Sequence, residues 1–444
     1  MIPVLTTAEM RAVDEAAPEP VEVLIERAGA AVARSALRML GGQAYGRRVA
    51  VVAGKGNNGA DGRVAARRLE LRGARVNVVD PGVPVPAGVD LVIDAAYGTG
   101  FRGSYTAPDP GGAPVLAVDV PSGVNGDTGE VCEGAVWADA TVTFAALKPG
   151  HLLGEGRLRC GPIELADIGL EIERVSSWLV EDADVAGQLP RRSHEAHKWQ
   201  TAVFVAAGSP GMMGAPLLVA RGAMRAGAGY VRLGVPGADV AALAPGHEAV
   251  AVRVPAHDWA PVVLTELERC KALVVGPGLG RGDEAARAVR RLVAASPVPV
   301  VVDADGLNVL GEVPGGVLTP HDKEFERLAG RPPGPDRMAD VRSLASSRNA
   351  TVLLKGSTTL VAEPDGTVLF AATGTPALAT AGTGDVLAGV VGAFLARGLP
   401  PLRAAAFAAH VHGAAAHLGY GEGLVAGDLP ELIARWLSVA VGRD

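Results

Sequence analysis

The sequence predicts two α/β domains, each built on a mainly parallel β-sheet. Short apolar runs rich in Val and Ile alternate with longer amphipathic stretches, which is the pattern of buried parallel strands joined by helices. The chain has 444 residues, more than one ordinary core holds. The alternation also breaks in a polar, Pro-containing stretch and then restarts. We therefore predict a first domain over residues 1–185, a linker over 186–198 and a second domain over 199–444.

The composition narrows the class of protein. Apolar residues make up 48% of the chain and charged residues 20%, which is typical of a soluble globular protein. The net charge of −7 argues against a nucleic-acid-binding surface, which is normally basic. Neither a signal peptide nor a membrane-spanning run is visible, and the three cysteines are scattered. We expect a cytoplasmic protein that binds neither nucleic acid nor a membrane.

In the first domain, four apolar runs are predicted as parallel strands and three amphipathic stretches as helices. The strands are expected within residues 48–54, 75–80, 90–95 and 115–120, and the helices within 8–17, 24–40 and 60–73.

The second domain repeats this pattern. The strands are expected within residues 201–208, 272–276, 298–304, 315–319, 350–356 and 358–370, and a helix within 214–229. The last of these runs contains Asp365-Gly366, a dipeptide that favours a tight turn, so residues 358–370 are predicted to form a hairpin.

A glycine-rich turn, "GKGNNGADG", follows the first predicted strand of the first domain. Gly54, Gly56 and Gly59 match the G-x-G-x-x-G pattern, and Asp80 lies 21 residues beyond Gly59 at the end of the next strand. This arrangement fits a dinucleotide-binding fingerprint. It also fits a tight strand-to-helix turn with no ligand, so both interpretations remain open here.

Other polar side chains follow neighbouring strands of the same sheet. Asp94 and Asp119 end two strands, and a glycine loop with Arg102 follows the first of them. The N–H groups of such a loop can bind phosphates. Because the carboxyl ends of parallel strands meet at one edge, Asn58, Asp94 and Asp119 are expected to lie together. Their oxygen atoms suit a hard cation.

The strand ends of the second domain carry a similar set of groups. They include Gly276–Gly280, Asp303, Asp305, Asn308, Thr319, His321, Glu324 and Lys355–Thr359. No Walker A motif is present, so another phosphate cradle is needed. "GTGD", residues 382–385, precedes an apolar helix and can hold a phosphoryl group. Asp385 would then accept a proton from an attacking hydroxyl, or would merely cap the helix. His410, His412 and His417 are predicted to be structural.

Taken together, these motifs resemble the family of bifunctional NAD(P)H-hydrate repair enzymes over nearly the whole chain. The first domain carries "GKGNNGADGRVAARRL", "DAAYGTGFRG", "VDVPSGV" and "TFAALKPG"; the second carries "GPGLG", "DADGLN", "LTPHDKEFERL", "LLKGSTT" and "GTGDVLAGVVGAFLA". The resemblance implies a Rossmann-like, three-layer α/β/α epimerase domain and a ribokinase-like α/β dehydratase domain. Ala60 stands where the family usually has Gly.

The resemblance also implies roles for individual residues. Asp119 would be catalytic in the first domain, where it contacts the reacting ring, and Asp385 would be the catalytic base in the second. Potassium would be bound by Asn58, Asp94 and Ser122. The hydrated dinucleotide would be bound in the first domain by Asn57, Asn58, Gly59, Ala60, Asp61, Gly98, Thr99, Gly100, Phe101, Arg102, Gly103 and Ser104. In the second domain the hydrate would contact Ala215, Gly278, His321 and Asp385, and the nucleotide would contact Lys355, Gly356, Ser357, Thr358, Thr359 and Gly384.

The activity that the resemblance implies is repair of NADH hydrate and NADPH hydrate. The first domain would interconvert the R and S epimers, by ring opening or by loss of water. The second would dehydrate the S epimer with ADP and Mg²⁺, giving AMP and phosphate, and Glu324 would hold Mg²⁺ through water. We also expect a homo-oligomer. One alternative is a small-alcohol or vitamin kinase fused to a non-catalytic dinucleotide-binding domain; another is an NAD-dependent dehydrogenase built on the glycine turn and Asp80.

Overall fold

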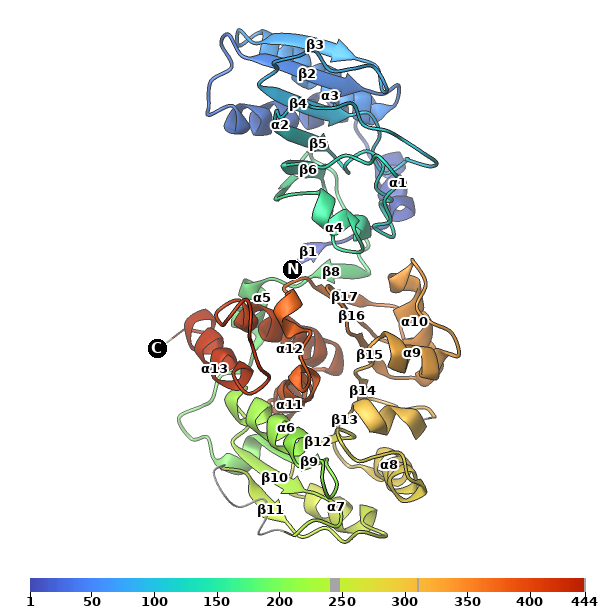
Figure 1. Ribbon diagram of the computed structural model, residues 1–444, viewed down its shortest axis with the longest axis vertical. Helices are drawn as coiled ribbons and strands as arrows, with labels where there is room; N and C mark the ends of the chain where they lie inside the picture. Colours follow the sequence, from blue (N-terminus) through green and yellow to red (C-terminus); the bar gives the residue numbers. More distant parts are fainter. Residues whose placement is uncertain (240–247, 310, 443–444) are drawn as a thin grey trace. The chain divides into compact units, whose positions relative to one another are not determined.

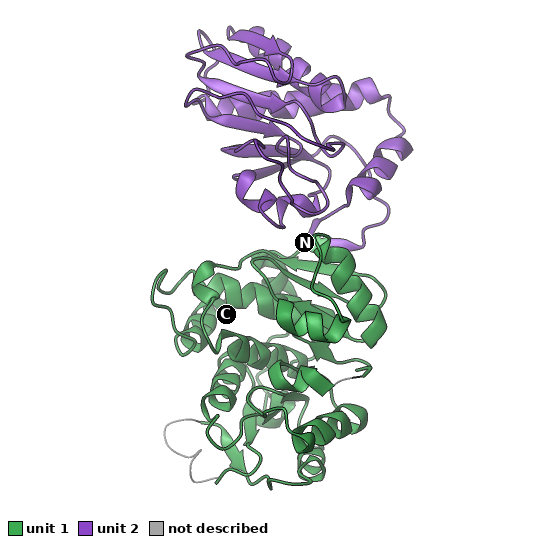
Figure 2. Cartoon of the chain, turned by 45° about the vertical axis from the view of Figure 1, so that its right-hand side comes forward, with its two compact units in different colours: residues 1, 178–444 green, residues 2–177 purple. Residues whose placement is uncertain are grey.

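The computed structural model describes residues 1–239, 248–309 and 311–442, which form two compact units (Figure 1). The first unit comprises residues 2–177, and the second comprises residue 1 with residues 178–444 (Figure 2). The division therefore comes before the predicted linker at 186–198. Residues 178–188 belong to the second unit because β8 (Ser177–Leu179) joins its sheet and Val185 of α5 (Asp182–Gln188) is buried in its core.

The first unit is built on a six-stranded sheet in the order β3-β2-β4-β5-β6-β7, in which every pair is parallel. The four predicted strands are confirmed, whereas β6 and β7 were not predicted. The strands are β2 (Arg48–Ala53), β3 (Arg75–Val79), β4 (Leu91–Ala95), β5 (Val115–Val118), β6 (Ala140–Phe144) and β7 (Ile163–Ala166), and the two-residue β1 (Ile2–Pro3) precedes them. The strand order reverses between β2 and β4, which is where doubly wound sheets bind ligands.

Helices cover one face of this sheet. The helices of the unit are α1 (Thr7–Ala16), α2 (Val21–Met39), α3 (Asn57–Glu70) and the short α4 (Gly156–Arg159). Apolar side chains of α2 and α3 pack with those of the central strands in one core. The opposite face is covered by loop residues, among which Phe101, Tyr105 and Val136 are buried. The first unit therefore has a Rossmann-like sheet whose second face is covered mainly by loops.

The second unit contains a larger mixed sheet. From β8 inward, its order is β8-β17-β16-β15-β14-β13-β12-β9-β10-β11. The neighbours from β15 to β11 pair in parallel, while β15, β16 and β17 pair antiparallel. The predicted hairpin is thus confirmed as β16–β17. The strands are β9 (Ala202–Ala206), β10 (Tyr230–Gly234), β11 (Val250–Val252), β12 (Ala272–Val275), β13 (Val300–Val302), β14 (Val317–Leu318), β15 (Thr351–Leu354), β16 (Thr359–Ala362) and β17 (Val368–Ala371).

Helices cover both faces of the second sheet. Figure 1 shows α6, α11 and α12 on one side and α8, α9 and α10 on the other. The helices are α6 (Gly214–Arg225), α7 (Ala260–Leu267), α8 (Asp283–Ala295), α9 (Asp322–Ala329), α10 (Arg337–Arg348), α11 (Thr383–Ala396), α12 (Pro401–Ala416) and α13 (Leu429–Ala440). After its first turn, α11 is buried on all sides. None of the helices described is both long enough and apolar enough to cross a bilayer.

Candidate active sites

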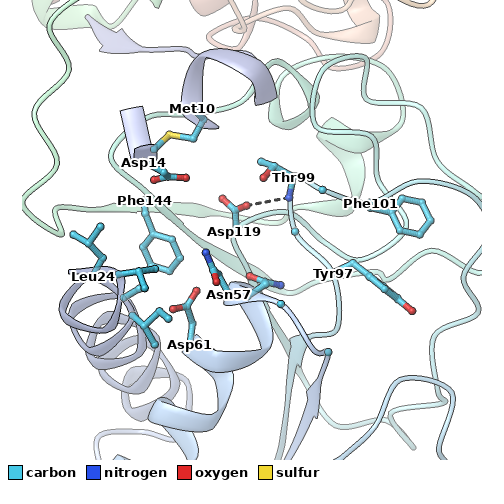
Figure 3. Close-up of a pocket in the computed structure, with 18 of the residues that line it drawn as sticks. Met10, Asp14, Leu24, Asn57, Asp61, Tyr97, Thr99, Phe101, Asp119 and Phe144 are labelled. Atoms are coloured by element: carbon cyan, nitrogen blue, oxygen red, sulfur yellow. Dashed lines mark hydrogen bonds between the residues drawn. The ribbon is translucent and has the colours of Figure 1, made fainter. Parts of the chain in front are cut away.

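A cavity of about 750 Å³ opens at the carboxyl ends of the strands in the first unit. Its walls come from the glycine turn after β2, the loop after β4, the end of β5 and parts of α1 and α2 (Figure 3). Of the predicted substrate-binding residues, Asn57, Asn58, Asp61 and Gly98–Phe101 line it. Gly59, Ala60, Arg102, Gly103 and Ser104 are not among its lining residues.

The glycine pattern of the turn has a steric origin. A β-carbon built at Gly59 would lie 1.9 Å from the Gly54 carbonyl oxygen, and one at Gly54 would lie 2.0 Å from the Ala96 carbonyl oxygen. Both glycines let backbone segments approach closely. A β-carbon at Gly56 would meet nothing within 4 Å, and Gly56 caps α3 where the helix begins at the cavity. Ala60 lies inside α3, so the departure from the family's glycine causes no left-handed strain.

Asp119 follows β5 and lies at the centre of the cavity wall. Its backbone is left-handed, with φ at 66°, which is uncommon for a residue other than Gly. Its Oδ1 accepts hydrogen bonds from Lys148 Nζ at 2.7 Å and Thr143 Oγ1 at 3.1 Å, and its Oδ2 accepts one from the Thr99 backbone N–H at 3.2 Å. Burial alone would raise the pKa of Asp119, but the Lys148 ammonium brings it below its ordinary value. Asp119 is therefore a buried carboxylate that stays ionised.

His151 holds the backbone of Asp119 in place. Its Nδ1 accepts a hydrogen bond from the Lys148 backbone N–H at 3.1 Å, so Nε2 carries the proton and donates to the Asp119 carbonyl at 2.8 Å. Burial, followed by the nearby Lys148 charge, lowers the pKa of His151 to about 4. A neutral imidazole thus serves as a structural bridge. Neither His151 nor Lys148 was predicted to belong to the site, although Lys148 lies in the "TFAALKPG" motif.

Other carboxyl groups also line this cavity, among them those of Asp14 on α1 and Asp61 on α3 (Figure 3). Burial, together with the charges of Asp119 and Asp14, raises the pKa of Asp61 to about 8. Burial also raises the pKa of Asp14, against the opposing effect of Lys148. The cavity therefore pairs an ionised carboxylate, Asp119, with a protonated carboxyl, Asp61. Such a pair can accept a proton on one side of a substrate and donate one on the other.

The three residues predicted to bind potassium lie at the ends of neighbouring segments. Asp94 Oδ1 accepts a hydrogen bond from Ser122 Oγ at 2.7 Å, and Oδ2 accepts one from the Ser122 backbone N–H at 2.8 Å. Burial raises the pKa of Asp94 to about 6, and hydrogen bonds from Ser122 and the Ala96 N–H oppose this rise. The side-chain oxygen and nitrogen of Asn58 are buried without a hydrogen-bond partner.

In the second unit, the predicted residues gather where β13, β14 and β15 end. Lys355 Nζ donates to Asp303 Oδ1 at 2.7 Å, and Thr319 Oγ1 donates to the same oxygen at 2.7 Å. A β-carbon built at Gly384 would lie 3.4 Å from Lys355 Nζ. The lysine ammonium therefore adjoins the first turn of α11. Asp303 was noted at a strand end, but no role was predicted for it.

Asp385 lies in the first turn of α11, at the third helical position. The helix is capped by Gly382, whose φ is 90°, so Asp385 is not the N-cap residue. Burial, followed by the charge of Asp303 and to a smaller extent that of Glu324, raises the pKa of Asp385 to about 7. The charge of Lys355 opposes this rise. A half-buried carboxyl with a pKa near 7 beside a helix N-terminus is suited to accept a proton at neutral pH.

The other residues predicted to contact the hydrate or the nucleotide lie at helix ends, in loops or at the start of a strand of the second unit. His321 caps α9: its Nδ1 accepts from the Lys323 N–H, and Glu324 Oε2 accepts from the His321 N–H at 3.0 Å. A β-carbon at Gly278 would lie 3.3 Å from the Ala215 β-carbon, so these two are neighbours. Residues 355–358 connect β15 to β16, and Thr359 is the first residue of β16.

The histidines on α12 and directly after it were predicted to be structural, and each lies against a carbonyl or carboxylate oxygen of the chain. His412 Nε2 donates to the Thr383 carbonyl at 3.0 Å, and burial lowers the pKa of His412 to about 4. His410 Nε2 lies 2.7 Å from Asp182 Oδ1, and His417 Nε2 lies 3.1 Å from the Thr373 carbonyl.

The raised pKa of Asp61 predicts a specific pH dependence of stability. Between pH 4 and 8 the unfolded chain has this carboxyl ionised while the folded chain keeps it protonated, so the stability falls as pH rises. Asp61→Asn removes this loss. We expect the variant to gain stability over wild type progressively from about pH 4 to pH 8, measured by urea unfolding of the first unit. An equal difference at both ends of this range would contradict the raised pKa.

Comparison with known proteins agrees with the two-unit architecture. A family model described as "YjeF-related protein N-terminus" matches residues 21–87 and 81–150, and one described as "NAD(P)H-hydrate dehydratase" matches residues 203–438. The ADP/ATP-dependent NAD(P)H-hydrate dehydratase of Bacillus subtilis, co-crystallised with ATP and Mg²⁺, is 29% identical with a TM-score of 0.51, covering 59% of this chain and 97% of its own. A ribokinase-like superfamily protein from Enterococcus faecalis shares the fold, at 19% identity and a TM-score of 0.54, over 61% of this chain and 98% of its own.

Full-length similarity extends across both units. The bifunctional NAD(P)H-hydrate repair enzyme of Salinibacter ruber is 37% identical over 98% of this chain and 96% of its own length. This identity, the matches of both family models in the expected order and the two strand-end sites lead to one assignment: the chain belongs to the family of bifunctional NAD(P)H-hydrate repair enzymes.

Proposed function

We propose that the protein repairs hydrated NADH and NADPH, with the second unit dehydrating the S epimer at the expense of ADP and the first unit converting the R epimer to S. The observation that carries the proposal is the arrangement around the first turn of α11. There a carboxyl with a pKa near 7, Asp385, lies beside the ammonium of Lys355, which Asp303 holds in place.

The dehydration uses phosphoryl transfer to create a better leaving group. Asp385 accepts the proton of the hydrate's hydroxyl group while the oxygen of that hydroxyl attacks the β-phosphorus of ADP. This step forms a phosphate ester of the hydrate and releases AMP. The backbone N–H groups at the start of α11 bind the migrating phosphoryl group. Phosphate then leaves with the electron pair of its C–O bond as the ring nitrogen donates its lone pair. Loss of a proton from the neighbouring carbon restores the reduced nicotinamide.

The side chains of the second unit fit a magnesium ion that is shared with the nucleotide. Within residues 1–239, 248–309 and 311–442, no group of three or more His, Cys, Asp or Glu side chains could hold a metal ion alone. Mg²⁺ is usually held by one or two carboxylates, several waters and substrate phosphates. Glu324, buried and close enough to raise the pKa of Lys355, is the residue we propose to hold it through water. The ion would neutralise charge on the ADP oxygens.

In the first unit, the ionised Asp119 and the protonated Asp61 supply a base and an acid to one cavity. Asp119 accepts or returns the proton of the hydrate's hydroxyl, and Asp61 donates to the opposite side of the ring. This pair serves epimerisation by ring opening as well as by loss and return of water. Lys148 keeps Asp119 ionised, and His151 fixes its backbone.

We propose potassium at Asn58, Asp94 and Ser122 in the first unit. The support is the buried Asn58 oxygen that lacks a partner, and the buried carboxylate of Asp94, held by neutral N–H and O–H donors. Oxygen ligands of this kind suit a hard cation. The cytoplasmic location and the homo-oligomeric state remain predictions.

One assay tests the function as a whole. Mixed R and S hydrates of NADH are incubated with the protein, ADP and Mg²⁺, and the absorbance of the reduced nicotinamide is followed with AMP and phosphate. Recovery of both epimers with one AMP per NADH supports the proposal. A stable phosphorylated alcohol, without regained absorbance, would instead identify the small-alcohol or vitamin kinase.

Asp385→Asn is expected to lower ADP-dependent dehydration by about 100-fold or more, because an amide cannot accept the hydroxyl proton. Nucleotide binding should survive, since the backbone N–H groups of α11 are unchanged. Turnover of the S epimer and equilibrium binding of ADP are measured in parallel. Turnover near the wild-type rate would show that Asp385 is not the base.

Asp119→Asn is expected to abolish consumption of the R epimer beyond its spontaneous rate, while dehydration of the S epimer continues unchanged. The substitution keeps the shape of the side chain but removes its charge. The fast and slow phases of NADH recovery from mixed epimers measure the two activities in one experiment. Full conversion of both epimers would exclude Asp119 as the working acid or base.

Exchange of potassium for sodium is expected to slow the R-epimer phase and leave the S-epimer phase unaffected. Because a bound ion stabilises the folded state, potassium should also raise the unfolding temperature of the wild type but not of Asn58→Ala. An equal effect of potassium on both proteins would place the ion elsewhere.

A further inference from the structure

Asp80 belongs to the first cavity, although the proposed chemistry does not use it. It follows β3, which pairs in parallel with β2 so that Val79 lies opposite Val52, and it lines the same cavity as Gly54 and Gly56. Its side chain is exposed, and within the described chain no hydrogen bond or ion pair engages its carboxylate. The group is therefore free to meet a ligand.

The position of Asp80 relative to Asp119 suits the two ends of a dinucleotide. In the sheet order β3-β2-β4-β5, these residues follow strands that are three places apart. At roughly 4.8 Å per strand, this separation is about 14 Å. The N-terminus of α3 lies between them, at the end of β2, and can bind a pyrophosphate. If the reacting ring lies at Asp119 and the pyrophosphate at α3, the adenosine ribose lies next to Asp80.

The charge of the cavity is also relevant. Its lining includes the carboxyl groups of Asp14, Glu19, Asp61, Asp80 and Asp119, but only two ammonium groups, those of Lys55 and Lys148. Lys148 is already paired with Asp119. Lys55 follows Gly54 in the glycine turn, where a pyrophosphate would lie. A 2′-phosphate carries about −1.5 to −2 charges at neutral pH. Apart from these two lysines, no Lys or Arg side chain is among the lining residues to meet it.

We propose that Asp80 selects the unphosphorylated dinucleotide at the first site, so that epimerisation favours NADH hydrate over NADPH hydrate. This inference rests on the epimerase function proposed above and adds the substrate form that it prefers. The Asp80 carboxylate accepts a hydrogen bond from the 2′-hydroxyl of the adenosine ribose, as acids in this position do in dinucleotide-binding folds. A 2′-phosphate replaces that donor with negative charge and is repelled.

The test compares the R epimers of the two hydrates as substrates of the full-length protein with ADP and Mg²⁺. The S epimers, assayed separately, report the second unit's own preference. An excess of the Asp119→Asn variant is added to each assay, because it supplies dehydration without epimerisation and so keeps dehydration from limiting the rate. The rate that this variant gives by itself is subtracted. Asp80→Asn removes the charge at similar size, and Asp80→Arg reverses it. Glu70→Gln removes the same charge from an exposed position at the end of α3, away from the cavity.

For the wild type and Glu70→Gln we expect kcat/KM for epimerisation to be at least about tenfold higher with NADH hydrate, because like charges brought together at an interface strongly disfavour binding. Asp80→Asn should reduce this ratio mainly by raising the rate with NADPH hydrate, and Asp80→Arg should invert it. The S-epimer rates should not change in any variant.

Two results would overturn the inference alone: equal wild-type rates with both hydrates, as expected if Lys55 receives the 2′-phosphate, or a ratio that Asp80→Asn leaves unchanged. Failure of the wild type to epimerise either hydrate above the subtracted rate would overturn the proposed epimerase function and this inference together.

Discussion

The parallel pairing of strands is the constraint on which both sites depend. Parallel strands that are joined by crossovers all end at the same edge of a sheet, and the segments that follow them must meet there. In the first unit this edge gathers residues from β2, β3, β4 and β5 around one cavity. In the second, it brings Asp303 after β13 together with Lys355 after β15. Residues that are 52 positions apart in the chain thus form a direct ion pair.

At each edge, one lysine forms an ion pair with a carboxylate, Lys148 with Asp119 and Lys355 with Asp303. Lys148 keeps Asp119 ionised and leaves Asp61 as the group that holds a proton. Lys355 is bound directly to Asp303, while burial and the charge of Asp303 raise the pKa of Asp385, in the first turn of α11, to about 7. A buried carboxylate that lost such a partner would be costly. In both units, therefore, one carboxylate is paired with a lysine, while another carboxyl group has a pKa near neutrality.

Most strands could be predicted because buried parallel strands, such as β2 and β4, have continuous apolar sequences. Strand β6, with the sequence ATVTF, was missed because Thr141 and Thr143 interrupt its apolar run, although both are buried. The domain boundary was placed too late because residues 182–198 are polar, and only the tertiary structure shows Val185 inside the second core. Asp119 and Asp385 could be singled out from their positions at strand and helix ends. The role of Lys148 could not, because it depends on a contact with a residue 29 positions earlier.

The left-handed backbone of Asp119 has an evolutionary consequence. Asn, Asp and Gly adopt this conformation most readily, whereas β-branched and bulky residues are strained in it. Substitutions that survive at this position should therefore be mainly to Asn or Gly, each of which is a single-base change from an Asp codon. A lineage that no longer needed the first activity could lose its charge without losing the fold of the first unit. Homologous domains that have lost the activity should then be recognisable by Asn or Gly in place of Asp119 after β5, in a sheet that is otherwise unchanged.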